Sequence, residues 1–223
     1  MKAMILAAGR GERLRPLTDS VPKPLVEVAG QALLARHLER LAAAGFREAV
    51  INVSHLAARI VERFGDGARY GLAIRWSREE TPLETAGGVA RALPLIGDRP
   101  FLLVNSDVWC DFDFARWKDY GLGKRLAHLL LVRNPRHHPA GDFTLDDGTV
   151  GNAASPRYTY AGIAVIAPRL VAGVTPGEKA QLAPLWRAAA ERGEVSGELH
   201  EGRWSDVGTP ERLAELERLL KKP

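Results

Sequence analysis

The chain has 223 residues, of which 46% are hydrophobic, so it is long enough to bury the core of one compact domain. Its 31 basic and 27 acidic side chains leave a formal net charge of +4 and are interspersed along the chain. Without a basic tail or a basic-and-aromatic stripe, we expect no nucleic acid and no membrane partner, and a small anionic substrate suffices. The single cysteine, Cys110, cannot form a disulfide within these residues, which favours a reducing, cytoplasmic location.

Strands alternate with helices in the first half of the chain. Leu34, Leu38 and Leu41 recur at helical spacing, and Gly45 is suited to end that helix. The apolar runs and periodic segments predict strands at 2–7, 48–53, 72–77 and 101–105, with helices at 33–44, 56–64 and 88–93. Strand–helix–strand order of this kind predicts a parallel sheet covered by helices.

The second half has a different pattern. We expect strands at 126–132, 142–145, 158–167 and 199–204, and helices at 182–192 and 210–220. Asp146-Asp147-Gly148 is typical of a hairpin turn, and Thr209 before Pro210 is typical of a helix start. The whole chain, 1–223, is therefore predicted to be a single α/β domain, a Rossmann-like mixed sheet flanked by helices, with a small antiparallel β portion.

The loop after the first strand has the composition of an anion site. Gly9 and Gly11 can expose backbone amides to a phosphate, and cationic side chains follow closely at Arg10, Arg13, Arg15 and Lys23. The dinucleotide fingerprint G-x-G-x-x-G does not fit, because position 14 is leucine, and the pattern G-x-x-x-x-G-K-[ST] is absent.

A carboxylate is expected at the edge of the sheet beside this loop. The strand at 101–105 leads directly into Ser106-Asp107, and ligands bind at the carboxyl ends of parallel strands. Among phosphate-binding groups, Asp107 suits a Mg²⁺ ligand, and the chain lacks a Cys/His spacing typical of zinc. The alternative is that Asp107 only ends a strand or caps the next helix. Asp111-Phe112-Asp113 is a weaker candidate, since one of these aspartates is expected to cap the following helix.

The sequence Ala7-Ala8-Gly9-x-Gly11-x-Arg13-Leu14-x-Pro16-Leu17-Thr18, with Pro22-Lys23-Pro24-Leu25 downstream, resembles the signature of the sugar-1-phosphate nucleotidyltransferases. The resemblance extends from Met4 to about Leu216. It implies the glycosyltransferase-A-like fold of that family, with a nucleotide-binding half at about 1–110 and a sugar-binding half at about 111–223. It also implies a reaction in which a sugar 1-phosphate attacks the α-phosphorus of a nucleoside triphosphate and releases pyrophosphate.

The resemblance assigns roles to individual residues. Trp204-Ser205-Asp206-Val207-Gly208-Thr209 is similar to the family's W-x-D-x-G-T, which implies that Asp206 holds Mg²⁺ together with Asp107. The implied catalytic residues are Lys23, Arg13, Asp107 and Asp206, and the implied nucleotide-binding residues are Ala8, Gly9, Gly11, Glu12, Arg13, Lys23, Gly87 and Gly88. In the stretch Thr85-Ala86-Gly87-Gly88, backbone groups would contact the base, and Glu84 replaces a glycine that many members have there.

On the sugar side, the resemblance implies contacts from Asn105, Gly141, Asp142 and Gly162. Asn105-Ser106-Asp107-Val108-Trp109 and His137-His138-x-x-Gly141-Asp142-Phe143 are similar to a branch that couples UTP to N-acetylmuramic acid α-1-phosphate for peptidoglycan recycling. Arg136, His137 and His138 are then candidates to contact the lactyl carboxylate of that sugar. His37 and His55 are interpreted as structural.

Three alternatives remain at this point. The runner-up is the mannose-1-phosphate guanylyltransferase branch. A non-catalytic sugar-nucleotide sensor on the same fold is disfavoured, because a sensor could discard Lys23, Asp107 or Asp206 and all three are present. A nicotinamide oxidoreductase is disfavoured by Leu14. The working expectation for the oligomeric state is a monomer.

Overall fold

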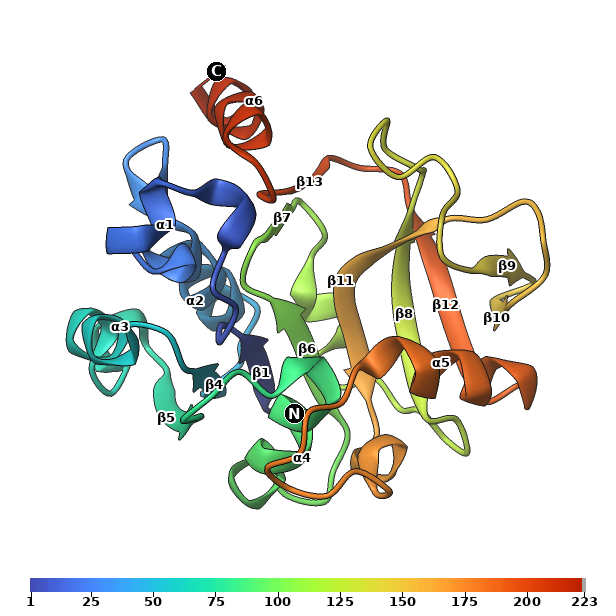
Figure 1. Cartoon of the computed structure of the whole chain (residues 1–223). Coiled ribbons are helices and arrows are strands. Elements are labelled where there is room, and N and C mark those ends of the chain that lie inside the picture. Colours follow the sequence, from blue (N-terminus) through green and yellow to red (C-terminus); the bar gives the residue numbers. More distant parts are fainter. Residues whose placement is uncertain (222–223) are drawn as a thin grey trace.

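A nine-stranded mixed sheet forms the centre of the molecule in the computed structural model, which describes residues 1–221 (Figure 1). The strand order is β5-β4-β1-β6-β11-β8-β12-β10-β9. The bounds are β1 Ala3–Leu6, β4 Glu48–Val53, β5 Ala73–Arg78, β6 Phe101–Asn105, β8 Ala127–Val132, β9 Thr144–Asp146, β10 Thr149–Gly151, β11 Thr159–Ile166 and β12 Val195–His200. Strands β5, β4, β1 and β6 are parallel, and β11 runs antiparallel to both β6 and β8.

Helices cover both faces of the sheet, as the alternation of side chains along the strands requires. The helices are α1 Leu17–Ser20, α2 Leu33–Ala43, α3 Ala57–Phe64, α4 Glu84–Ile96, α5 Leu182–Glu191 and α6 Pro210–Lys221. In β1, Ala3 and Ile5 join a core cluster with residues of α2 and α3, whereas Met4 joins a second cluster with residues of α4 and α5. The predicted α/β fold with a mixed sheet flanked by helices is confirmed.

Two short antiparallel pairs lie outside the large sheet. Strand β7 (Val108–Cys110) pairs with β13 (Trp204–Asp206), and β2 (Glu27–Val28) pairs with β3 (Gln31–Ala32). Helix α6 packs on the second pair through a small core of its own that includes Val28, Val207 and Leu216. In Figure 1, α6 (red) lies near the blue elements around α1 and α2, which are early in the chain.

Several predicted elements match closely, and others need correction. The strands at 48–53 and 101–105 are confirmed, as is the hairpin turn, where Asp147 and Gly148 have φ of 42° and 73°. The predicted strand at 199–204 is wrong, because the chain breaks at 201–203 and forms two strands, β12 and β13, that join different sheets. The helix expected at 88–93 runs further in both directions, as α4. No helix within residues 1–221 is long and apolar enough to cross a membrane.

Candidate active site

A cleft of about 800 Å³ opens at the carboxyl ends of β1, β4 and β6. This is the edge of a parallel sheet at which ligands are expected. Its lining comes from seven parts of the chain: the loop after β1, Lys23, the end of β4, the end of β6, the start of α4, Lys179 and Gly208. Ala8, Gly9, Gly11, Glu12, Arg13, Lys23, Asn105 and Asp107 all line it, so the cleft gathers most of the sequence-predicted residues.

The loop after β1 is held in shape by its own backbone. Gly11 has φ of 68°, a left-handed conformation that glycine adopts without strain, and its carbonyl accepts bonds from the Leu14 amide (2.9 Å) and the Thr18 hydroxyl (2.8 Å). A Cβ at position 11 would lie 3.2 Å from Cβ of Lys23. The absence of a side chain at Gly11 therefore lets the Lys23 stem pass close to the loop and reach the cleft.

Lys23 and Asp107 form an ion pair inside the cleft. The Lys23 Nζ lies 2.5 Å from Oδ2 of Asp107, and the two side chains are 11% and 26% exposed. Lys23 begins the single turn Lys23–Leu25, and Asp107 lies in the two-residue turn between β6 and β7, so both positions are fixed by ordered backbone. The pair places a cation and a carboxylate beside the loop after β1, where a charged ligand can exchange partners with either.

The β7–β13 ribbon carries the second aspartate to the same place. Asp206 pairs in register with Val108, and the Val207 amide donates to the carbonyl of Asp107 (2.7 Å). Sequence spacing could not show this, because the two segments are distant in the chain and meet only in a three-residue strand pair. The backbones lie side by side, although the carboxylates have different neighbours: Asp107 lines the cleft and Asp206 lines an adjoining hollow.

The Asp206 carboxylate is only half satisfied by hydrogen bonds. Nη1 of Arg212 donates to Oδ2 (2.5 Å) and also to Nε2 of His137 (2.8 Å). A guanidinium only donates, so Nε2 of His137 accepts and cannot also donate to Asp206 Oδ1, which lies 3.1 Å away. Within residues 1–221, Oδ1 is buried without a donor. A buried carboxylate oxygen left over in this way, on a strand whose backbone pairs beside that of Asp107, fits a hard divalent cation such as Mg²⁺.

The glycines expected to contact the base do not line the cleft. Gly87 and Gly88 are buried in α4, where a Cβ would lie 2.3 Å from the carbonyl oxygen of Glu178 and 2.7 Å from Nδ2 of Asn52, respectively. Their lack of a side chain therefore serves packing of α4. The cleft is lined at this point by Thr81, Pro82, Glu84 and Thr85.

Glu84 occupies a backbone position that suits glycine. Its φ is 62°, in the left-handed region that costs an ordinary residue about 1–2 kcal/mol. Glycine would adopt this conformation without strain, and in this chain the position places an exposed carboxylate at the cleft. The neighbouring Thr85 hydroxyl accepts from the Leu182 amide (2.8 Å) and so joins α4 to α5.

Sequence reasoning missed a buried hydrogen-bond network that joins the loop after β1 to the start of α4. Asn52 accepts from the Ala7 amide (2.8 Å) and donates to Oε1 of Glu79 (2.7 Å). The other oxygen of Glu79 accepts from the Leu83 amide (3.0 Å), and Glu79 is 5% exposed. An asparagine at the end of a strand and a glutamate just beyond the next strand were the available signals, since buried polar groups need partners.

Lys179 was also missed. It lines the cleft from a loop whose next residue, Ala180, accepts from the Ala86 and Gly87 amides (2.8 and 3.1 Å). A lone lysine in a polar loop gives no signal in the sequence.

The predicted sugar-side residues are divided by the structure. Asn105 lines the cleft. Gly162, with φ of 77°, packs against the Asn105 side chain, since a Cβ at position 162 would be 3.1 Å from Nδ2 of Asn105. Asp142 is engaged elsewhere, by Nε2 of His138 (3.0 Å) and the Tyr160 amide (2.8 Å). Gly141, Asp142 and Gly162 line neither the cleft nor the adjoining hollow.

The adjoining hollow has a volume of about 410 Å³ and is lined by Pro135, Arg136, His137, Trp204, Ser205, Asp206, Thr209, Arg212 and Glu215. Arg136 and His137 thus face the ribbon that carries Asp206. His138 does not line the hollow, because its ring is turned to Asp142. Of the three side chains predicted to contact the lactyl carboxylate, Arg136 and His137 therefore line the hollow and His138 does not.

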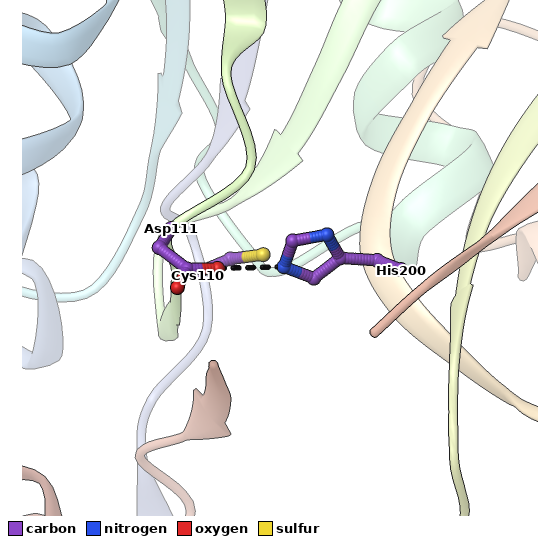
Figure 2. Close-up of side chains that lie close together, drawn as sticks. All are labelled: Cys110, Asp111 and His200. Atoms are coloured by element: carbon purple, nitrogen blue, oxygen red, sulfur yellow. Dashed lines mark hydrogen bonds and ion pairs between the residues drawn. The ribbon is translucent and has the colours of Figure 1, made fainter. Parts of the chain in front are cut away.

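A separate cluster lies further along β7. Cys110, Asp111 and His200 bring one ligand atom each within 4.8 Å of one another, and Figure 2 shows His200 reaching Asp111 from the end of β12. Nε2 of His200 lies 2.7 Å from Oδ1 of Asp111, and burial raises the pKa of the Cys110 thiol to about 11. Because the thiol is buried and protonated and the carboxylate is already paired, we interpret this cluster as a structural contact that links β7 to β12.

The remaining candidates from the sequence have structural positions. Asp113 accepts from the Ala115 amide (2.9 Å), which confirms the expected helix cap. His37 is 3% exposed, and burial, followed by the charge of Arg40, lowers its pKa to about 4, so the ring is neutral near pH 7.

Residues 2–136 match the family model for nucleotidyl transferases. The chain belongs to this family, whose members are enzymes that act on a nucleoside triphosphate and a sugar phosphate, commonly with a divalent metal ion. Over 98% of both chains it is 49% identical to N-acetylmuramate alpha-1-phosphate uridylyltransferase of Neisseria meningitidis. It is 36% identical to the protein of the same name from Caulobacter vibrioides, over 98% of this chain and 97% of that one.

More distant relatives share the fold. Mannose-1-phosphate guanylyltransferase catalytic subunit beta of Dictyostelium discoideum is 32% identical over 94% of this chain and 62% of its own length. A putative glucose-1-phosphate thymidylyltransferase from Bacillus anthracis superimposes with a TM-score of 0.88 at 18% identity, covering 100% of this chain and 96% of that one. The predicted family is therefore confirmed.

Proposed function

We propose that the protein transfers a uridylyl group from UTP to N-acetylmuramic acid α-1-phosphate and releases pyrophosphate. The observation that carries the proposal is the 49% identity, over 98% of both chains, to an enzyme named for that reaction. The guanylyltransferase alternative is less supported, because those relatives are 32% identical at most among the ones compared and are matched over 62% of their length. The present chain's cleft and its charged residues are consistent with an active enzyme.

The chemistry needs positioning more than covalent participation. An oxygen of the sugar phosphate must approach the α-phosphorus in line with the departing pyrophosphate, and both reactants are anions. In the proposed arrangement, the amides of Gly9 and Gly11 and the Arg13 guanidinium hold the β- and γ-phosphates. Lys23 stabilises charge on the α-phosphate, leaving Asp107 to a metal ion. Ala8 and Glu12 would complete the lining of the phosphate loop.

We assign the metal site to Asp107 and Asp206 and favour Mg²⁺ because carboxylates, phosphate oxygens and water are its preferred ligands. When bound, the ion would supply neutralisation of phosphate charge. The support from this chain is the undonated Oδ1 of Asp206 and the ribbon that places it next to Asp107. For Asp206 to serve, its carboxylate must turn from Arg212 toward the cleft, a side-chain movement on fixed backbone.

The acceptor is proposed to enter from the side of residues 111–223, with residues 1–110 holding the nucleotide. Asn105 is the strongest sugar contact, since it lines the cleft at the end of β6. Gly162 would act by letting Asn105 and β7 pack closely, and Gly141 and Asp142 would act by shaping the neighbouring loop. Gly87 and Gly88 would support the base-contacting start of α4 from beneath. We further propose a cytoplasmic, monomeric enzyme.

Pyrophosphate release over a matrix of substrates tests the proposal. The nucleotides are UTP, GTP, dTTP and CTP, and the acceptors are the 1-phosphates of N-acetylmuramic acid, N-acetylglucosamine, mannose and glucose, all with magnesium. We expect the highest kcat/KM with UTP and the lactyl sugar. A preference for GTP with mannose 1-phosphate would replace this function by the alternative, and absence of turnover with every pair would favour a sensor.

A further inference from the structure

The hollow beside the cleft contains a cation that the proposed mechanism does not use. Arg212, on the first turns of α6, lines the hollow, and its side chain is only 11% exposed. Its guanidinium lies directly against the backbone of Gly208, where a Cβ would be 1.9 Å from Nη2. Gly208 lines the nucleotide cleft, so Arg212 stands on the wall between the cleft and the hollow.

The guanidinium has donors to spare. Nη1 is occupied by Asp206 and His137, whereas Nε and Nη2 donate to no acceptor among residues 1–221. Three N–H groups are therefore available in the planar fork that matches a carboxylate. Nε and Nη2 of Arg212 are accessible to solvent, because the buried polar atoms without a hydrogen-bond partner do not include either nitrogen.

Metal binding would change the charge balance of the hollow. Two arginines, Arg136 and Arg212, line it against two carboxylates, Asp206 and Glu215. If Asp206 turns to the metal, one carboxylate is withdrawn and Arg212 loses its charged partner. The hollow then carries an excess positive charge when the acceptor sugar binds.

We propose that this hollow is the subsite for the carboxylate arm of the acceptor sugar, with Arg212 as its specificity-determining residue and Arg136 as a second cation at its rim. The inference rests on the proposed function, since N-acetylmuramic acid differs from N-acetylglucosamine by a lactyl group that bears a carboxylate. Arg212 exchanges the Asp206 carboxylate for the substrate carboxylate. His137 accepts a hydrogen bond from Nη1 and so helps to orient the guanidinium in the hollow.

The test compares two acceptors in the same variants. The ratio of kcat/KM for N-acetylmuramic acid 1-phosphate to that for N-acetylglucosamine 1-phosphate is measured in wild type, Arg212→Gln, Arg212→Lys and Arg136→Gln. Loss of one charge-assisted hydrogen bond predicts a fall in this ratio of about 10- to 100-fold for Arg212→Gln. Arg212→Lys retains the charge without the fork, so its ratio should fall less. Arg218→Ala is the matched control: this arginine is on the same helix, is exposed, and among residues 1–221 donates only to Ala214.

The outcomes separate the inference from the function on which it rests. An equal fall in kcat/KM for both acceptors in Arg212→Gln would mean that Arg212 contacts the phosphate that both sugars share or positions Asp206. That result would overturn the subsite while leaving the function intact. A wild-type enzyme with no preference for the lactyl sugar would overturn the function itself. If Arg212→Gln fails to fold, Arg136→Gln decides, because its exposed side chain makes no hydrogen bond or ion pair within residues 1–221; an unchanged ratio there overturns the subsite.

Discussion

Replacement of Lys23 by alanine should lower turnover by about 10²- to 10³-fold. The Nζ is 2.5 Å from Oδ2 of Asp107 and its side chain is 11% exposed, so the loss removes a cation from a partly dry site and leaves Asp107 facing an anionic substrate. Two unit charges 4 Å apart at an effective dielectric constant of 20 interact by about 4 kcal/mol. If about two thirds of this is specific to the transition state, the rate falls by about 10²-fold, since each 1.36 kcal/mol is tenfold.

The assay is steady-state pyrophosphate release with saturating UTP and acceptor, so that kcat is read apart from KM. Lys23→Arg should recover part of the rate, because it restores the charge at a different reach. Arg15→Ala is the control: Arg15 is on the same segment, but it is 58% exposed, pairs with Asp19 and does not line the cleft. Its kcat should stay within about twofold of wild type. A Lys23→Ala enzyme that turns over within threefold of wild type would refute the role, provided its unfolding curve is unchanged.

Three further changes act through packing and positioning. Asn52→Ala breaks the bond to the Ala7 amide and should raise KM for the nucleotide by about tenfold with a smaller change in kcat, as loss of a buried hydrogen bond of 1–1.5 kcal/mol predicts; an unchanged KM would count against the network. Leu216 is 1% exposed, so Leu216→Ala should lower the free energy of unfolding measured in urea by about 2–5 kcal/mol, or α6 should unfold separately in an earlier transition. Gly162→Ala should cost about 1–3 kcal/mol, because the new Cβ would lie 2.7 Å from Val108; a thermal midpoint equal to wild type would show that β7 can move away.

The parallel half of the fold could be predicted from the sequence because its signals are local. Strands such as 48–53 and 101–105 are mostly apolar runs bounded by polar residues, and their carboxyl ends must gather at one edge. The phosphate loop was predictable for a similar reason, since Gly9, Gly11 and the cations after them are consecutive or nearly so. Asp107 followed from its place after β6.

The β7–β13 ribbon was not predictable in the same way. Each strand has three residues, too few for a pattern, and their pairing depends on how distant segments pack. The expected strand at 199–204 joined two elements that the structure separates at Glu201–Arg203, because polarity alone cannot show where a chain leaves one sheet for another. Resemblance supplied Asp206, whereas its neighbour Arg212 looked like any charged residue of a surface helix.

The glycines of α4 show a second limit. Gly87 and Gly88 were expected at the ligand because small residues allow close backbone approach, and the structure uses that property against Glu178 and Asn52. Glycine in a motif indicates that something approaches closely, without indicating what. Lys179 shows the converse, since its position in the cleft depends on a loop whose next residue, Ala180, is held by backbone bonds to α4.

The central claim is that Asp107 and Asp206 hold one divalent cation against the nucleotide. Binding of Mn²⁺, as a paramagnetic substitute for Mg²⁺, can be measured by electron paramagnetic resonance in the presence of a non-hydrolysable UTP analogue. For wild type we expect one tight site per chain, weakened at least tenfold in both Asp107→Asn and Asp206→Asn, with magnesium-dependent turnover lowered by about 10²-fold or more in each. An Asp206→Asn enzyme that retains wild-type Mn²⁺ affinity and turnover would contradict the shared site and leave Asp206 as the partner of Arg212 alone.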